Sequence, residues 1–82
     1  MTAEEMFNKL GYKKTDKTEN YFVYDDKTAF IDSSYNAYKR IFFDLQDHTV
    51  CCELIDDMGT HICDLWADEI KVINKQIEEL GW

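Results

Sequence analysis

Five side chains that can bind zinc lie within sixteen residues of the chain: His48, Cys51, Cys52, His61 and Cys63. Zinc in proteins takes four nitrogen or sulfur donors that converge as a tetrahedron. Neighbouring residues of a strand point to opposite faces, so Cys51 and Cys52 cannot both ligate within a regular sheet. We therefore predict no bound metal or cofactor and interpret the cysteines as small strand residues. A zinc-binding protein is kept as an alternative hypothesis.

The same residues also suggest nucleophile–base pairs, either Cys63 with His61 or Asp47 with His48. Nucleophilic catalysis needs a third group that orients the base, and a donor for the developing oxyanion. The sequence marks neither of these groups. We predict that the protein is not an enzyme.

Two pairs of adjacent acids stand between apolar runs, Asp25-Asp26 and Asp56-Asp57. A calcium loop needs oxygen ligands at alternate positions and a closing bidentate carboxylate, and neither pair has that spacing. Aspartate stabilises turns through hydrogen bonds from its own side chain. We interpret all four residues as solvated turn aspartates.

The composition predicts a single domain over residues 1–82 with an acidic surface. Hydrophobic residues make up 45% of the chain and aromatic residues 15%, enough for one core, and the formal net charge is −8. This charge argues against direct binding to nucleic acid, which needs a basic surface. Apolar runs are too short to span a membrane. Three cysteines, two of them adjacent, do not form a disulfide framework, so we expect a reducing cytoplasm.

Helix signals mark both ends of the chain. Residues 2–10 begin with a capping-box pattern and end before Gly11, which predicts a short helix. A second helix is predicted from an N-cap at Asp64 to Gly81, and we expect its apolar stripe to be buried against the sheet. That stripe consists of Trp66, Ile70, Ile73, Ile77 and Leu80.

The middle of the chain is predicted to form antiparallel strands. Strands are predicted from residue 12, at 21–24, 29–31, 38–45, 49–55 and 60–63, with turns or loops at 15–20 and 32–36. A two-residue turn at Asp47-His48 would pair Phe43 with Cys52 and Ile41 with Leu54. The expected fold is therefore α+β, with an antiparallel sheet of three to five strands and both helices on one face.

Phe42 faces outward if its neighbours Ile41 and Phe43 face the core. An outward aromatic residue flanked by acids is typical of an interaction surface. The alternative is that the loop at 30–37 covers Phe42, or that the ring is simply exposed. The predicted partner-binding residues are Phe42, Asp44, Glu53, Asp56, Asp57, Asp25 and Asp26.

Three segments carry a resemblance to a group of known proteins: the N-terminal helix from Met1 to Tyr12, the hairpin strands around 41–50, and the C-terminal helix from Ile73 to Trp82. In these segments the chain resembles small phage and mobile-element proteins of low-GC Gram-positive bacteria. The resemblance implies a setting in a bacterial host and no activity. Together with the acidity, it favours a protein-binding module that modulates or inhibits a host protein with a basic surface. The alternative is a homo-oligomeric structural protein, a homodimer for instance, without an external ligand.

Overall fold

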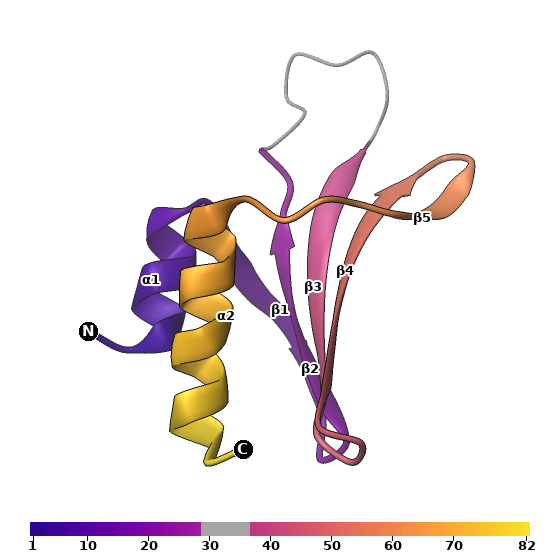
Figure 1. Cartoon of the computed structure of the whole chain (residues 1–82). Coiled ribbons are helices and arrows are strands. Elements are labelled where there is room, and N and C mark those ends of the chain that lie inside the picture. The colour runs from indigo at the N-terminus through magenta and orange to yellow at the C-terminus, as the bar shows by residue number, and fades with distance from the viewer. Residues whose placement is uncertain (29–36) are drawn as a thin grey trace.

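Two helices and a five-stranded antiparallel sheet form the computed structural model (Figure 1), which describes residues 1–28 and 37–82. Each strand pairs with the next one along the chain. The elements are α1 (Ala3–Lys9), β1 (Lys13–Lys17), β2 (Tyr21–Asp26), β3 (Tyr38–Asp44), β4 (Thr49–Asp56), β5 (Gly59–Ile62) and α2 (Ala67–Leu80). The α+β prediction is confirmed. The predicted strand at 29–31 and loop at 32–36 fall outside the described residues.

The capping box predicted for α1 is present. Thr2 Oγ1 accepts a hydrogen bond from the backbone N–H of Glu5 at 3.2 Å, and the Glu5 carboxylate accepts one from Thr2 at 2.9 Å. Gly11 follows the helix with φ +99°, a conformation that favours glycine, and the chain turns there into β1. At the other end of α1, Glu79 of α2 accepts a hydrogen bond from Ala3 N–H at 2.7 Å. Local capping thus sets the length of α1, and this bond joins it to α2.

The first strand is longer than predicted. Residues 15–20 were expected to form a turn, but β1 continues to Lys17, with an irregularity in its pairing between Lys14 and Asp16. A charged, irregular edge strand resists pairing with other chains. The prediction of a turn over the whole polar stretch is therefore wrong, because polarity at a sheet edge is compatible with a strand.

The central hairpin pairs with a register two residues away from the predicted one. Phe43 lies opposite Val50, and Ile41 lies opposite Cys52. A shift of two residues leaves every side chain on its predicted face, because side chains alternate with period two. The predicted faces are therefore correct although the predicted pairs are wrong.

A four-residue loop, 45–48, accounts for the different register. The carboxylate of Asp44 accepts hydrogen bonds from the backbone N–H groups of Gln46 and Asp47, at 2.9 and 3.0 Å. His48 takes the left-handed conformation at φ 57°, which completes the reversal of the chain. The two backbone hydrogen bonds that the Asp44 side chain accepts thus favour this wider loop over a two-residue turn.

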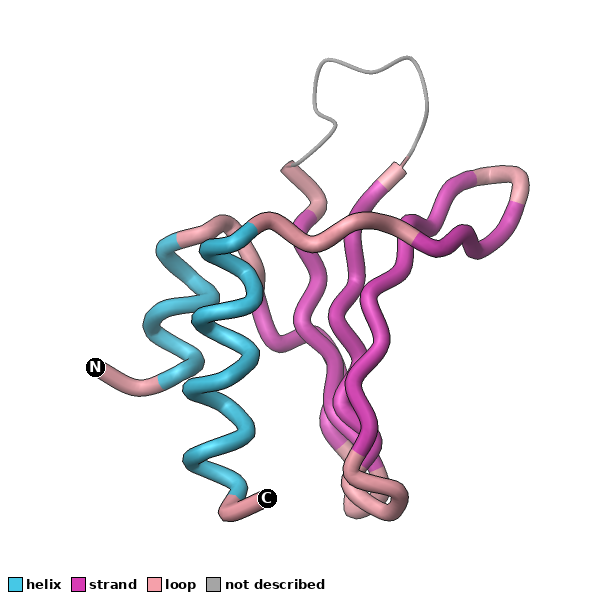
Figure 2. The backbone as a smooth tube through the Cα atoms, in the orientation of Figure 1, coloured by secondary structure: helices cyan, strands magenta, loops and turns pink. Residues whose placement is uncertain are grey.

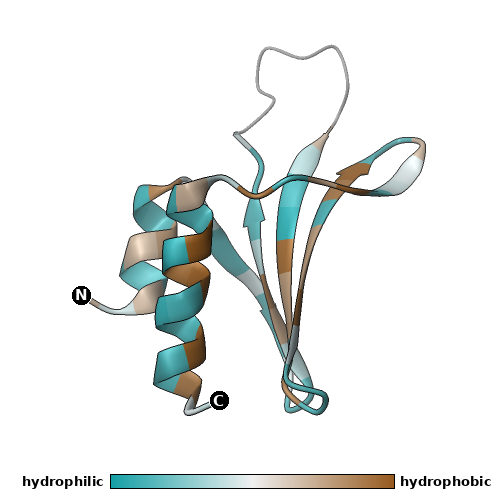
Figure 3. Ribbon diagram, viewed as in Figure 1, coloured by the Kyte–Doolittle hydropathy of each residue, from teal (hydrophilic) through white to brown (hydrophobic). Residues whose placement is uncertain are grey.

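Both helices lie side by side on the same face of the sheet (Figure 2). The hydrophobic side of α2 is turned toward that face (Figure 3), and aromatic rings fill much of the space between the layers. Phe7 of α1 stacks on Tyr24 of β2 with ring centroids 4.0 Å apart, and Phe22 stacks on Phe43 at 4.9 Å. The buried core consists of Phe7, Tyr12, Phe22, Tyr24, Ile41, Phe43, Val72 and Ile73.

The helix α2 is rotated relative to the predicted stripe. Trp66 is 75% exposed and Ile70 is 45% exposed, so the expectation that both are buried is wrong. The helix instead buries Glu69 and Gln76 beside its apolar residues. Gln76 accepts a hydrogen bond from the Tyr24 hydroxyl at 2.8 Å, so this polar group is satisfied inside the protein.

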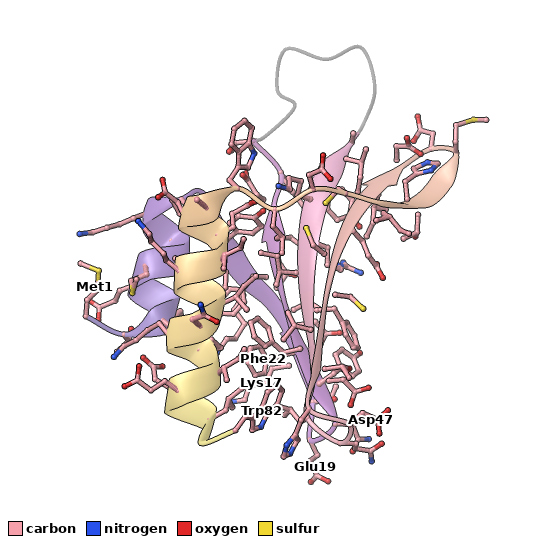
Figure 4. All side chains as sticks on the ribbon, in the orientation of Figure 1. Met1, Lys17, Glu19, Phe22, Asp47 and Trp82 are labelled. Carbon is pink, nitrogen blue, oxygen red and sulfur yellow. The ribbon has the colours of Figure 1, made fainter. Side chains whose placement is uncertain are left out.

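The two ends of α2 differ in how well they were predicted. The N-cap is Trp66 and not Asp64, because the carboxylate of Glu69 reaches back to the Trp66 backbone N–H at 2.7 Å. Gly81 ends the helix in the left-handed conformation, as expected. Trp82 (labelled in Figure 4) then packs against the core, with its ring centroid 6.5 Å from that of Phe43. Within the described residues, no helix is long and apolar enough to cross a bilayer.

Truncation of Ile73 should destabilise the protein more than truncation of Ile70 on the same helix. Ile73 is buried in the core, and Ile73→Ala should lower the free energy of unfolding by about 2–5 kcal/mol. Ile70→Ala removes the same atoms from a half-exposed site and should cost less than about 1 kcal/mol. Chemical denaturation of both variants measures the difference. Equal costs would contradict the rotation of α2 described above.

Candidate functional site

A buried polar cluster connects the start of α2 to the sheet and to the segment between α1 and β1. The Lys39 ammonium donates to both carboxylate oxygens of Glu69, at 2.8 and 2.9 Å. The Tyr12 hydroxyl donates to the same carboxylate. Lys39 also donates to the backbone carbonyl of Asp64 at 3.3 Å. Within the described part of the chain, these buried groups all find partners.

The environment of this cluster favours a charged Glu69. Burial by itself raises the pKa of a carboxyl group, but the hydrogen bonds from Lys39, Tyr12 and the Trp66 backbone lower the pKa of Glu69 below its ordinary value. Burial and the neighbouring Glu69 carboxylate raise the pKa of the Tyr12 hydroxyl well above its ordinary value. The Tyr12 hydroxyl therefore stays protonated at neutral pH and donates a hydrogen bond to Glu69. Lys39 and Glu69 form a structural ion pair.

A cavity of about 330 Å³ opens beside the cluster, and Trp66, Asp26 and Lys39 contribute to its lining. The patterns in the sequence did not lead us to predict this cluster. The sequence nevertheless contained an indication of the cluster. Lys39 is two positions from Ile41 on the same strand, so both side chains face the helices. A lysine on the inner face predicts an acid on the facing helix, and Glu69 is that acid.

The opposite face of the sheet has no helix over it in the described part of the chain (Figure 1). Phe42 lies near its centre, between Val23 on β2 and Cys51 on β4. The ring of Tyr21 stacks on Phe42 with centroids 5.1 Å apart. We call this side of the sheet the outer face. The loop at 30–37, the alternative cover for Phe42, falls almost entirely outside the described residues.

Acidic side chains surround this aromatic pair. Asp16 accepts a hydrogen bond from the Tyr21 hydroxyl at 2.8 Å, and Asp44 lies across from Tyr21. Glu53 lies on β4, on the same face as Phe42. The predicted site residues Phe42, Asp44 and Glu53 are thus brought together on the outer face.

Asp25 and Asp26 are not the solvated turn residues that the sequence suggested. They end β2 and are 4% and 7% exposed. Arg40 forms a bidentate ion pair with Asp25, in which its Nε and Nη2 atoms lie 2.8 and 3.0 Å from the two carboxylate oxygens. Burial would raise the pKa of Asp25, but hydrogen bonds from Arg40 and Thr15 lower it below its ordinary value. Asp26 accepts hydrogen bonds from Thr28. The charge of Asp25 is therefore largely neutralised within the protein.

Asp56 and Asp57 lie at the turn between β4 and β5, away from Phe42. Asp56 accepts a hydrogen bond from the Met58 backbone N–H at 2.8 Å and contacts the His61 ring at 3.2 Å. Asp57 is exposed in the turn itself. These two acids therefore form a separate acidic end of the hairpin.

The five possible zinc ligands are dispersed by the fold. His48 stacks on Trp82 with ring centroids 4.6 Å apart, and His61 contacts Asp56. Cys51 is exposed on the outer face, whereas Cys52 packs toward the core. In residues 1–28 and 37–82 there is no group of three or more potential metal ligands. Only the thiols of Cys52 and Cys63 meet, at an Sγ–Sγ distance of 2.8 Å.

Removal of the Glu69 charge should destabilise the protein in a pH-dependent way. Glu69→Gln leaves Lys39 buried without its counter-ion, which should cost about 3–5 kcal/mol at about pH 7. Because folding lowers the pKa of Glu69, its charge stabilises the folded state above its unfolded pKa of about 4.3, and this contribution disappears as the pH falls through the folded pKa. Urea denaturation at about pH 7 and about pH 3 should therefore show the two proteins converging in acid.

A matched control is Glu78→Gln, which removes an exposed acid from the same helix. It should change the unfolding free energy by less than about 0.5 kcal/mol at either pH. A Glu69→Gln cost as small as that of the control would show that the ion pair does not hold α2 in place.

The described residues thus present three chemically distinct features. They are the buried cluster around Glu69, the thiol pair of Cys52 and Cys63, and the outer face centred on Phe42. Comparison with protein-family models, with curated proteins and with solved structures finds no match for this chain.

Proposed function

We propose that this chain is a non-enzymatic protein-binding domain that contacts a basic partner protein through its outer face. The observation that carries the proposal is the aromatic pair Tyr21–Phe42, which lies on the outer face among acidic side chains. Aromatic residues supply much of the energy of protein interfaces when they are desolvated at the centre of the contact.

The geometry of Phe42 suits an anchor. Its cross-strand neighbour Cys51 is exposed and adds apolar surface on one side, and the buried Val23 lies next to the ring on the other side. Neighbouring strands of a sheet hold these side chains in fixed positions, so little conformational entropy is lost on binding. A rigid, half-buried ring of this kind presents a small hydrophobic centre for a partner to cover.

The charges on the outer face suit a basic partner. Within the described strands, four acids lie on this face, namely Asp16, Asp25, Asp44 and Glu53, against the two bases Lys13 and Arg40. The whole chain carries a formal charge of −8, so the surrounding field is also negative. Complementary charge at the rim of an interface accelerates association and discriminates against acidic partners.

The proposed setting is a bacterial cytoplasm, with a host protein as the partner and the chain as its modulator or inhibitor. The resemblance to phage and mobile-element proteins favours this setting. A host protein that binds nucleic acid would offer the basic surface that the outer face requires. Occupation of that surface by an acidic domain would exclude nucleic acid from it.

Charge reversal on β4 and its turn should slow the association. The variant Glu53→Lys/Asp57→Lys should keep the fold, because neither residue belongs to the core, and its association rate should fall about tenfold at low salt. Raising the salt from about 0.1 M to about 1 M should weaken wild-type binding steeply. Partners are first identified by capture from a Gram-positive bacterial lysate, and the rates are then measured with the purified partner.

The matched control is Glu19→Lys/Glu78→Lys, which makes the same change of charge at two exposed sites away from the centre of the outer face. It should slow association less than the β4 variant. Phe42→Ala should increase the dissociation rate, because it removes the anchor. An affinity that changes neither with salt, nor with charge reversal, nor in Phe42→Ala would contradict the proposal. The acidity would then serve solubility alone.

The alternative, a homo-oligomer, has one observation in its favour. The strand β5 ends the sheet, all four of its residues are exposed, and Ile62 is 98% exposed. An exposed edge strand is a template for pairing with another copy of the chain. In this hypothesis two β5 strands would pair across a two-fold axis, with Ile62 at the contact.

Sedimentation of the pure protein separates the two hypotheses. The proposed binding domain should sediment as a monomer over the micromolar range. A dimer that dissociates in an Ile62→Lys variant, but not in an Asp57→Lys variant of the adjoining turn, would favour the homo-oligomer.

A further inference from the structure

Cys52 and Cys63 form a cross-strand pair of thiols at the end of the β4–β5 ladder. Glu53 lies opposite Ile62, so Cys52 and Cys63 are the next pair in the same register. Their sulfur atoms are 2.8 Å apart, and both cysteines are free thiols. Cys51 points to the outer face and stays out of this contact.

The backbone geometry of this pair suits a disulfide. Directly opposed residues of antiparallel strands have Cα atoms about 4.5–5.5 Å apart. A disulfide requires a Cα separation of about 4.4–6.8 Å, so the bond can form here without a large movement of the backbone. The antiparallel ladder of β4 and β5 holds the two thiols in place before any oxidant arrives.

The two thiols differ in their surroundings. Cys52 packs against the core, and burial together with the hydrogen bond to Cys63 raises its pKa to about 12. Cys52 therefore keeps its proton at neutral pH, and the two sulfur atoms share one hydrogen bond. Cys63 lies in the link between β5 and α2 and is partly exposed. A small reagent can therefore reach Cys63 from solvent.

We propose that Cys52 and Cys63 are a redox modification site, which low-molecular-weight disulfides such as glutathione disulfide convert to an intramolecular disulfide. Cys63 loses its proton to solvent, and its sulfur attacks glutathione disulfide to form a mixed disulfide. The first glutathione leaves as a thiolate and takes up a proton. Cys52 then loses its proton and attacks the Cys63 sulfur, and the second glutathione leaves as a thiolate that takes up a proton. The two protein thiols are oxidised by two electrons, and one glutathione disulfide is reduced to two glutathione thiols.

Oxidation would cross-link the edge strand β5 to its neighbour β4. The new bond would join β4 to the residue that directly follows β5, so the exposed edge strand could no longer separate from β4 at that end. Edge strands with few buried contacts open readily in the reduced protein. The oxidised form should therefore show slower hydrogen exchange at the amides of β5.

The experiment equilibrates the full chain with mixtures of reduced and oxidised glutathione, blocks the remaining thiols with N-ethylmaleimide in denaturant, and counts the labels by intact mass. The reduced protein should carry three labels and the oxidised protein one, on Cys51. The equilibrium constant for oxidation should be at least about tenfold larger for the native chain than in concentrated urea, because the fold holds the thiols together.

Two variants act as matched controls. Cys51→Ser should oxidise like the wild type, with two labels when reduced and none when oxidised. Cys63→Ser retains only Cys51 and Cys52, so in the oxidising mixtures it should carry two labels or a mixed disulfide with glutathione that does not resolve. Equal constants in native buffer and in urea would overturn the proposal, as would a disulfide that includes Cys51. Because the comparison in urea uses the wild-type chain, it decides the question even if Cys63→Ser fails to fold.

Discussion

The buried carboxylate of Glu69 determines how α2 lies on the sheet. It accepts hydrogen bonds from Lys39 of β3, from Tyr12 ahead of β1, and from the backbone of Trp66. A buried charge is costly unless it is paired, so α2 is stable only in the orientation that brings Glu69 to Lys39. This orientation turns Ile70 toward solvent, although the apolar stripe by itself would have buried it.

Among residues 1–28 and 37–82, both helices lie on one face of the five-stranded sheet, and several polar groups on the other face pair with one another. On that outer face Arg40 pairs with Asp25, and Tyr21 stacks on Phe42. These contacts leave a half-buried aromatic centre among acidic side chains. We propose this surface as the contact for a partner protein.

The stability of the fold is distributed unevenly between the core and the β5 edge. Aromatic rings fill the space between the helices and β2–β3, whereas all the residues of β5 are exposed. Local opening is easiest where few apolar contacts are lost. The thiol pair lies at the boundary between these two regions, since Cys52 packs against the core and Cys63 begins the link to α2. A covalent bond at this boundary would have a larger effect on opening than one within the core.

The sequence alone determined the features that depend on neighbouring residues. Capping at Thr2, the stop at Gly81 and the alternation around Phe43 act within a few positions, so the elements and their strand faces could be predicted. The register, the rotation of α2, the pairing of Asp25 and the meeting of the two thiols were decided only by the tertiary structure. Lys39 and Glu69 are 30 residues apart. Their pairing depends on burial, which exists only once the layers have packed.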